Sequence, residues 1–561
     1  MRTNSLIAMA GAVALMSGLA GAAFGQDMAN MPGMSGMPGM EDHHHHDDGP
    51  ENLGHVDFPT SCAPASHEGI EHGIALLHSF GYVKAQAAFS AVAWNDPTCA
   101  MAHWGVAMTQ YQELWGMPDA DMMKRGTAEM AKAREIAAKG KATPRERAYI
   151  DALSAFFDPA DMPFQKRADA YTAKMDALHA AYPNDVEGAA FDALAILADT
   201  PPSETDLSHP HRALAILKPL FAAHPDHPGL AHYIIHTCDT PALAPEGLEA
   251  ALAYAKIAPA SPHALHMPGH IFARLGMWSE DIASNEASVA ASEAAATAGQ
   301  PGAAHQMHAD EFLIYAYLQT GQDEKAQALT AKMAGIGDRM LAMPGMDDMK
   351  SGGHFFDNEL RAVTAMEMHD WQAAAKLQPA AGSTVDNNYT IYWAQSAAAG
   401  HLHDAKLAAS ALVGLDKAID AMKAGPYAAY ADGMQVQRNE AIAWQALAED
   451  RPEDAVVAMR KAADQQDKLG QAEVDIPARE MLGDVLMLEH KPAEALAEYK
   501  VALKLSPNRL NGLLSAGMAA EQSGQMEVAR GYDKAAVAQT NNAATSQRPE
   551  LLHAVKLASG A

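Results

Sequence analysis

Soft metal ligands recur near the N-terminus of the chain. Five methionines stand at every third position, and four histidines follow them: Met28, Met31, Met34, Met37, Met40, His43, His44, His45 and His46. Methionine thioethers prefer Cu(I), whereas imidazoles suit Cu(II), Zn(II) or Ni(II). We therefore expect this segment to bind copper or zinc by wrapping around the ion. The alternative is a low-complexity tail with only adventitious affinity for metals.

A second set of imidazoles lies near the middle of the chain. His232 and His236 are four residues apart, as are His266 and His270, and the second pair follows the first after 34 residues. Residues four apart share one face of a helix, so each pair predicts two imidazoles side by side. If the two helices are neighbours, the four rings can meet around one ion at about 2.0–2.1 Å from each nitrogen.

Neighbouring residues extend this predicted cluster. Asp239 comes three residues after the first pair and is a candidate ligand or an acceptor that orients a ring, and His263 lies one turn before the second pair. Pro268 interrupts the second pair and would bend its helix, which either aims the two rings or separates them. His305 and His308 could lengthen a His-lined groove. A polar peptide-binding groove and ordinary packing remain as alternative interpretations of the cluster.

The framework that would carry these residues is helical and repetitive. Leu482-Gly483-Asp484 opens a helix that turns at His490-Lys491-Pro492, and Ala516-Gly517 stands at the matching place 34 residues later. A small residue recurs five places after each predicted turn, where two helices of a hairpin would cross: Ala326, Ala405, Ala455, Ala495 and Ala529. Pro228 and Pro262 suit the first turn of a helix, and Ser261 suits an N-cap.

This pattern resembles the tetratricopeptide repeat (TPR) family, whose unit is a helix-turn-helix with a period of 34 residues. The resemblance covers most of residues 70–540 and implies an all-α, TPR-like α-solenoid of about eight to ten hairpins, with the first helix of each hairpin on the concave side. The segments 76–82, 96–105 and 266–272 also resemble a group of secreted bacterial TPR proteins. That resemblance implies a fold and no chemistry.

The N-terminus predicts export. Arg2, an apolar run from Leu6 to Ala23 and the small residues around Gly25 are typical of a signal peptide over residues 1–25. No later run is long and apolar enough to span a bilayer. Because an exported chain can oxidise its thiols, we expect a Cys62–Cys99 disulfide and a free Cys238; three unpaired buried thiols are the alternative.

Net charge and missing motifs exclude several functions. The chain carries 69 acidic against 40 basic residues, a net charge of −29, so its surface repels nucleic acid. We find no His-Glu-x-x-His pair, nucleophile elbow, phosphate-binding glycine loop or dinucleotide fingerprint. An enzyme is therefore the less favoured interpretation.

We divide the chain into a signal peptide (1–25), a disordered Met- and His-rich tail (26–58), a first repeat array with the His cluster (59–341), a Met/Gly loop (342–353), a second array (354–545) and a C-terminal tail (546–561). The predicted function is binding of copper or zinc for sequestration, delivery or sensing in the periplasm or outside the cell. One alternative is a scaffold that holds a protein or peptide in the concave groove. A second alternative is a metal-dependent enzyme whose His-lined site leaves one position open.

Overall fold

The computed structural model describes residues 51–559 except 115–116, 141, 159–161, 202–203, 298–302, 336–349, 426–427 and 541–546. This part of the chain is α-helical and contains no β-strand. Its α-helices are α2 (His67–His78), α3 (Tyr82–Asn95), α4 (Ala100–Met108), α5 (Ala120–Ala138), α6 (Pro144–Phe157), α7 (Phe164–Ala181), α8 (Val186–Ala198), α9 (Ser208–Ala223), α10 (Pro228–Cys238), α11 (Ala244–Ile257), α12 (Pro262–His266), α13 (Pro268–Leu275), α14 (Trp278–Thr297), α15 (Ala303–Gln319), α16 (Asp323–Met333), α18 (Lys350–Glu367), α19 (Trp371–Ala374), α20 (Tyr389–Leu402), α21 (Ala405–Ala424), α22 (Gln435–Ala448), α23 (Pro452–Leu469), α24 (Ala478–Leu488), α25 (Pro492–Leu505), α26 (Leu510–Gln522), α27 (Met526–Gln539) and α28 (Pro549–Ala558).

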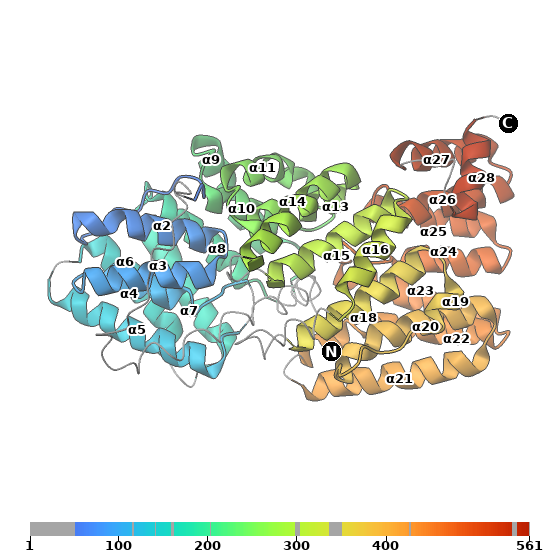
Figure 1. Ribbon diagram of the computed structural model, residues 1–561, viewed down its shortest axis with the longest axis horizontal. Helices are drawn as coiled ribbons and strands as arrows, with labels where there is room; N and C mark the ends of the chain where they lie inside the picture. Colours follow the sequence, from blue (N-terminus) through green and yellow to red (C-terminus); the bar gives the residue numbers. More distant parts are fainter. Residues whose placement is uncertain are drawn as a thin grey trace, which may run out of the picture.

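Consecutive helices pair into hairpins, and the first helices of most neighbouring hairpins pack against each other. The predicted all-α solenoid is therefore confirmed. The described residues form twelve such pairs, from α2/α3 to α26/α27. In this count α12 and α13 together are the first helix of one pair, and the short α19 is the partner of α18. The earliest hairpins carry no clear repeat signature, which is why the sequence predicted fewer. Figure 1 shows α2–α11 at one end of the molecule, the C-terminal helices at the other, and α13–α16 between them.

A left-handed residue ends the first helix of many hairpins, and a fully buried residue follows it five places later. Asp450 and His490 have φ of 60° and 58°, and Ala455 and Ala495 are each 0% exposed. The same spacing joins Gly321 to Ala326 and Gly524 to Ala529. This spacing corrects one predicted crossing residue, because the left-handed residue after α20 is His403. The buried alanine at that crossing is therefore Ala408, and the predicted Ala405 is exposed.

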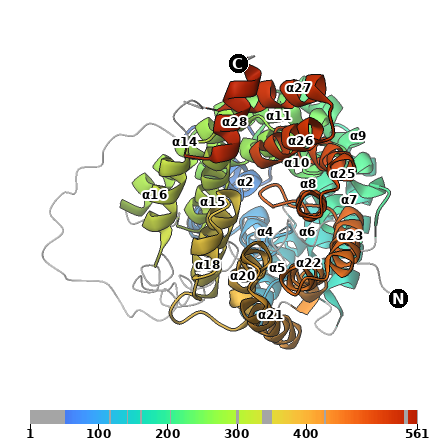
Figure 2. The same ribbon diagram turned by 90° about the vertical axis from the view of Figure 1, so that its right-hand side faces the viewer.

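The superhelix closes on itself. Viewed along the long axis, α15, α18, α20, α22 and α26 lie around the middle of the molecule (Figure 2), and α26 contacts α15. Arg509 holds this closure: it is 1% exposed, pairs with Glu367 at 2.8 Å and with Glu480 at 2.7 Å, and also binds the Tyr315 hydroxyl. Repeat solenoids usually contact only sequence neighbours. Here the closure brings residues 470–477, between α23 and α24, to the helices of the first array.

Three predicted segment boundaries differ from the structure. Residues 51–58, assigned to the tail, lie against the folded chain, because Leu53, Val56 and Phe58 are buried. Residues 350–353, assigned to the Met/Gly loop, begin α18, and the rest of that loop lies outside the described residues. The C-terminal tail contains α28, whose Leu551 is 0% exposed. A few buried apolar residues anchor residues 51–58 and the C-terminal tail to the folded chain, although both segments are otherwise polar.

Two further expectations concern compartment and membrane. In the structure Cys62 and Cys99 form a disulfide across the first hairpin, with Cα atoms 4.6 Å apart, and Cys238 is free and buried. The predicted signal peptide lies outside the described residues. Within the described part of the chain, no helix combines the length and apolar character that a bilayer crossing requires.

Candidate metal centre

The predicted His cluster lies on the first helices of two successive hairpins. His232 and His236 are on α10, His263 and His266 on α12, and His270 on α13. Both expected helix starts are present: Pro228 and Pro262 occupy the first turns, and the Ser261 hydroxyl caps α12 by accepting from the Ala264 N–H. Pro268 ends α12 and begins α13, but this interruption leaves His266 Nε2 and His270 Nε2 3.0 Å apart.

The first His group consists of His232, His236 and His263, and ring nitrogens of all three lie within 4.8 Å of one another. His232 Nε2 is 3.0 Å from His263 Nε2, while His232 Nδ1 donates to the carbonyl of His78 at 2.6 Å. Because Nδ1 carries that hydrogen, and burial holds the pKa of His232 well below its usual range, the lone pair of Nε2 points into the group. His236 Nε2 is buried without a hydrogen-bond partner.

The second His group consists of His266, His270 and His308, and its ring nitrogens also lie within 4.8 Å of one another. The centroids of the His266 and His308 rings are 4.5 Å apart, and those of His270 and His308 are 5.4 Å apart. All three side chains are buried. His308 comes from α15, the next first helix along the solenoid, so the group bridges two hairpins.

Each imidazole of the second His group has an oxygen at its Nδ1. His266 Nδ1 donates to Asn285 Oδ1 at 2.6 Å, and the Asn285 amide is fixed because its Nδ2 donates to Asp281. His308 Nδ1 lies 2.9 Å from Glu311 Oε2. Metal-binding histidines almost always have such a partner on the nitrogen opposite the ion, because it fixes the tautomer and the ring orientation. The arrangement leaves the Nε2 atoms for a common ligand.

His270 has the most acidic surroundings of the group. Its Nδ1 lies 3.0 Å from Asp239 Oδ2 and 3.0 Å from Glu473 Oε1. Arg274 binds Asp239 at 3.0 Å and Glu473 at 3.5 Å; burial opposes ionisation of Asp239, but Arg274 and His270 hold its pKa well below the usual range. Burial alone would lower the pKa of His270, but Asp239 and Glu473 raise it to about 10. Asp239 and Glu473 therefore stabilise a positive charge located between the Nε2 atoms of His266 and His270.

Other groups near this point are neutral. Burial, and then the charge on His270, lower the pKa values of His236 and His308 to about 3. Both imidazoles therefore offer lone pairs at neutral pH. Burial and the nearby Glu473 raise the pKa of Glu311 to about 8. A cation beside His308 would favour the ionised form of Glu311.

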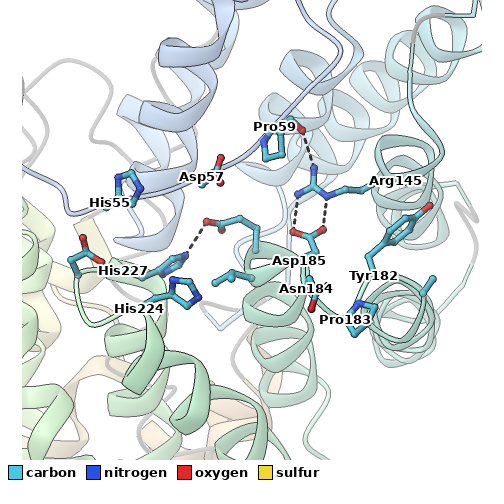
Figure 3. Close-up of a pocket in the computed structure, with 14 residues that line it drawn as sticks. His55, Asp57, Pro59, Arg145, Tyr182, Pro183, Asn184, Asp185, His224 and His227 are labelled. Carbon is cyan, nitrogen blue, oxygen red and sulfur yellow. Dashed lines mark hydrogen bonds and ion pairs between the residues drawn. The ribbon is translucent and has the colours of Figure 1, made fainter.

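A third His cluster and a neighbouring pocket differ from these groups. His78 and His227 both bind Glu187, at 2.6 Å and 2.9 Å. Their remaining nitrogens face the Tyr233 hydroxyl and the N–H of Leu230, so this cluster is an internal hydrogen-bond network. Beside it lies a pocket of about 560 Å³ (Figure 3). Two of its charged side chains, Arg145 and Asp185, pair with each other, and the carboxylates of Asp57 and Asp226 also line it.

The structure redistributes the predicted ligands. It separates His232 and His236 from His266 and His270, so the expected single site for these four is divided between two groups. His263 joins the first group, and Asp239 braces His270. The methionines and histidines of the N-terminal tail lie outside the described residues.

Sequence reasoning missed three of the contributors to the second group. Asn285 is 19 residues from His266, Glu311 is distinguished only by lying three residues after His308, and Glu473 is 203 residues from His270. The sequence indicated His308 only as a possible extension of a His-lined groove. It follows His270 by 38 residues, so it does not share the 34-residue spacing of the two His pairs.

Comparisons with known proteins identify no family. No family model matches the chain, and no curated protein matches it. The human IFIT1 dimer with PPP-AAAA aligns at 11% identity and a TM-score of 0.37, over 78% of this chain and 90% of that one. The TPR domain of P58(IPK) aligns at 10% identity and a TM-score of 0.20, over 82% and 99%. The APC/C hetero-tetramer Cut9–Hcn1 aligns at 12% identity and a TM-score of 0.30, over 88% and 96%. TM-scores this low carry no argument, so function is argued from the site.

Proposed function

We propose that this protein binds a transition-metal ion, copper or zinc, at the second His group. The observation that carries the proposal is the pairing of each Nδ1 with an oxygen acceptor: Asn285 for His266, Asp239 and Glu473 for His270, and Glu311 for His308. Three oriented imidazoles are a common ligand set for zinc and copper. A packing role alone gives no reason for all three rings to be oriented in this way.

The charge of the surroundings supports a divalent ion. Asp239 and Glu473 favour positive charge on His270, whose proton occupies the place of the proposed ion. An ion would displace that proton and receive the same electrostatic stabilisation. Three protein ligands leave a fourth position of a tetrahedral ion open to water or another small ligand. The Met- and His-rich tail and the predicted export signal fit an extracytoplasmic metal-handling role.

Elemental analysis tests the proposal. The tail must be silenced first, because its own ligands would also bind metal; in the tail-silenced protein, the full chain has its five tail methionines replaced by leucine and His43–His46 by asparagine. After loading with Zn(II) and dialysis, we expect one zinc per chain, and none in its His308→Ala variant. A tail-silenced protein that retains no zinc or copper would contradict the proposal.

A second candidate function is a protein-interaction scaffold. The closed superhelix of paired helices supports it, since solenoids present extended curved surfaces that bind peptides and proteins. The two functions separate experimentally. A scaffold would capture the same peptides from a peptide array with or without His308→Ala, whereas a peptide bound through the metal would be lost in that variant.

A further inference from the structure

The first His group lies beside the proposed metal site and resembles it in geometry. The centroids of His236 and His270 are 6.5 Å apart, and those of His263 and His266 are 6.4 Å apart. The two groups thus occupy adjacent positions along the solenoid: the first lies on α10 and α12, the second on α12, α13 and α15. They differ in what surrounds them.

Aromatic rings, together with one backbone carbonyl, surround the first His group. Phe80 contacts all three imidazoles, with centroids 4.4 Å from His232, 5.4 Å from His236 and 5.5 Å from His263. It stacks on the faces of His236 and His263, at 29° and 26°, and so does not cover the edges of these two rings. Tyr254 stacks on His232, with centroids 5.1 Å apart.

Phe80 has an unfavourable backbone conformation at this position. Its φ of 52° lies in the left-handed region, at the turn position that Gly321 and Gly524 occupy in other hairpins. A bulky residue there is strained, whereas glycine is not. Packing against the three imidazoles offsets this strain. The ring therefore fixes the imidazoles together in an apolar shell.

An apolar shell favours an ion of low charge. The desolvation cost of an ion rises with the square of its charge, so a divalent ion costs about four times as much as a monovalent one in the same shell. The Nδ1 of His232 donates to the backbone carbonyl of His78 rather than to a carboxylate. His236 Nε2 is a buried nitrogen without a hydrogen-bond partner, so its lone pair is available to a ligand. Copper(I) is the monovalent ion of this series; its preferred ligands are thioethers and thiolates, but imidazoles bind copper too.

We infer that the first His group binds a second metal ion, copper(I), so that His232, His236 and His263 form a cuprous site beside the divalent site of His266, His270 and His308. This inference rests on the proposed function for the second group. It assigns different ions to two groups of the same three-imidazole chemistry. The difference arises from the carboxylates of Asp239, Glu473 and Glu311, which contact the second group. A phenylalanine contacts all three rings of each group, Phe80 in the first and Phe312 in the second.

Metal stoichiometry under anaerobic conditions tests the inference on the full-length tail-silenced protein. Loading with excess Cu(I) should give two copper ions per chain, and loading with Zn(II) alone should give one zinc. His236→Leu should retain one copper and one zinc, whereas His308→Ala should retain one copper and no zinc. His401→Leu is the matched control, because His401 Nε2 is also buried without a partner but belongs to neither group, and it should retain both copper ions.

The possible failures are distinguishable. One copper in the tail-silenced protein that survives His236→Leu would overturn the second site and leave the proposed function intact. Two zinc ions per chain would overturn the assignment to a monovalent ion. No copper and no zinc would overturn the proposed function itself. Far-UV circular dichroism of the metal-free variants checks folding, and His263→Asn, with the same expected stoichiometry, replaces His236→Leu if that variant does not fold.

Discussion

Glu311 offers a test of how the protein orients a ligand without touching the ion. Its Oε2 lies 2.9 Å from His308 Nδ1, and both side chains are buried. Glu311→Leu removes the acceptor and frees the His308 ring, while Glu311→Gln keeps an oxygen at nearly the same place. Loss of such a partner lowers metal affinity about 10–100-fold, equal to about 1.4–2.7 kcal/mol. We expect that loss for Glu311→Leu and a smaller loss for Glu311→Gln.

The assay is a competition titration of Zn(II) between the tail-silenced protein and a chromophoric chelator. Glu440→Leu is the control, because Glu440 is also a buried carboxyl with a hydrogen bond, to Trp393 Nε1 at 2.6 Å, but it contacts neither His group. Its zinc affinity should equal that of the tail-silenced protein. An unchanged affinity in Glu311→Leu would refute the argument that oriented imidazoles define the site.

Three further predictions concern stability. Arg509→Met leaves Glu367 and Glu480 buried without their cation, so the free energy of unfolding should fall by about 3–5 kcal/mol in denaturant titrations; a loss below about 1 kcal/mol would mean that the closure does not depend on Arg509. Burial raises the pKa of Glu440 to about 8, so the folded protein keeps this proton while the unfolded chain loses it, and stability falls as pH rises from about 4.5 to 8 by about 1.4 kcal/mol per pH unit. Glu440→Gln should therefore raise the melting temperature at pH 8 much more than at pH 5, and an equal effect at both values would contradict this. Reduction of Cys62–Cys99 should lower the free energy of unfolding by about 3–4 kcal/mol, and non-reduced digests should contain the linked pair; two free thiols in exported protein would exclude the bridge.

The helical framework was predictable because local rules determine it. Alanine at the crossing of each hairpin, proline in first turns and serine at an N-cap all act within a few residues. One turn is an exception: the spacing predicts the turn after α20 at Gly400, five residues before Ala405, whereas the left-handed residue is His403. Glycine is the usual residue there, but histidine, asparagine and aspartate also adopt that conformation. The predicted Ala405 was therefore three residues too early.

The grouping of the histidines was not predictable from spacing. A period of 34 residues places His232 and His266 at equivalent positions, but equivalent positions on neighbouring helices need not share one ion. The third member of each group comes from a different register, as His263 and His308 show. Glu473 reaches His270 only because the superhelix closes, and a nearest-neighbour repeat pattern contains no information about closure.

The coordination of a bound ion tests the central claim most directly. X-ray absorption spectroscopy at the zinc edge, on the tail-silenced protein loaded with one equivalent of Zn(II), measures the ligands around the ion. We predict three imidazole nitrogens at about 2.0–2.1 Å with one further light ligand. His308→Ala should lose this signal, and His401→Leu should retain it. A shell of oxygens without imidazole scattering would contradict the account.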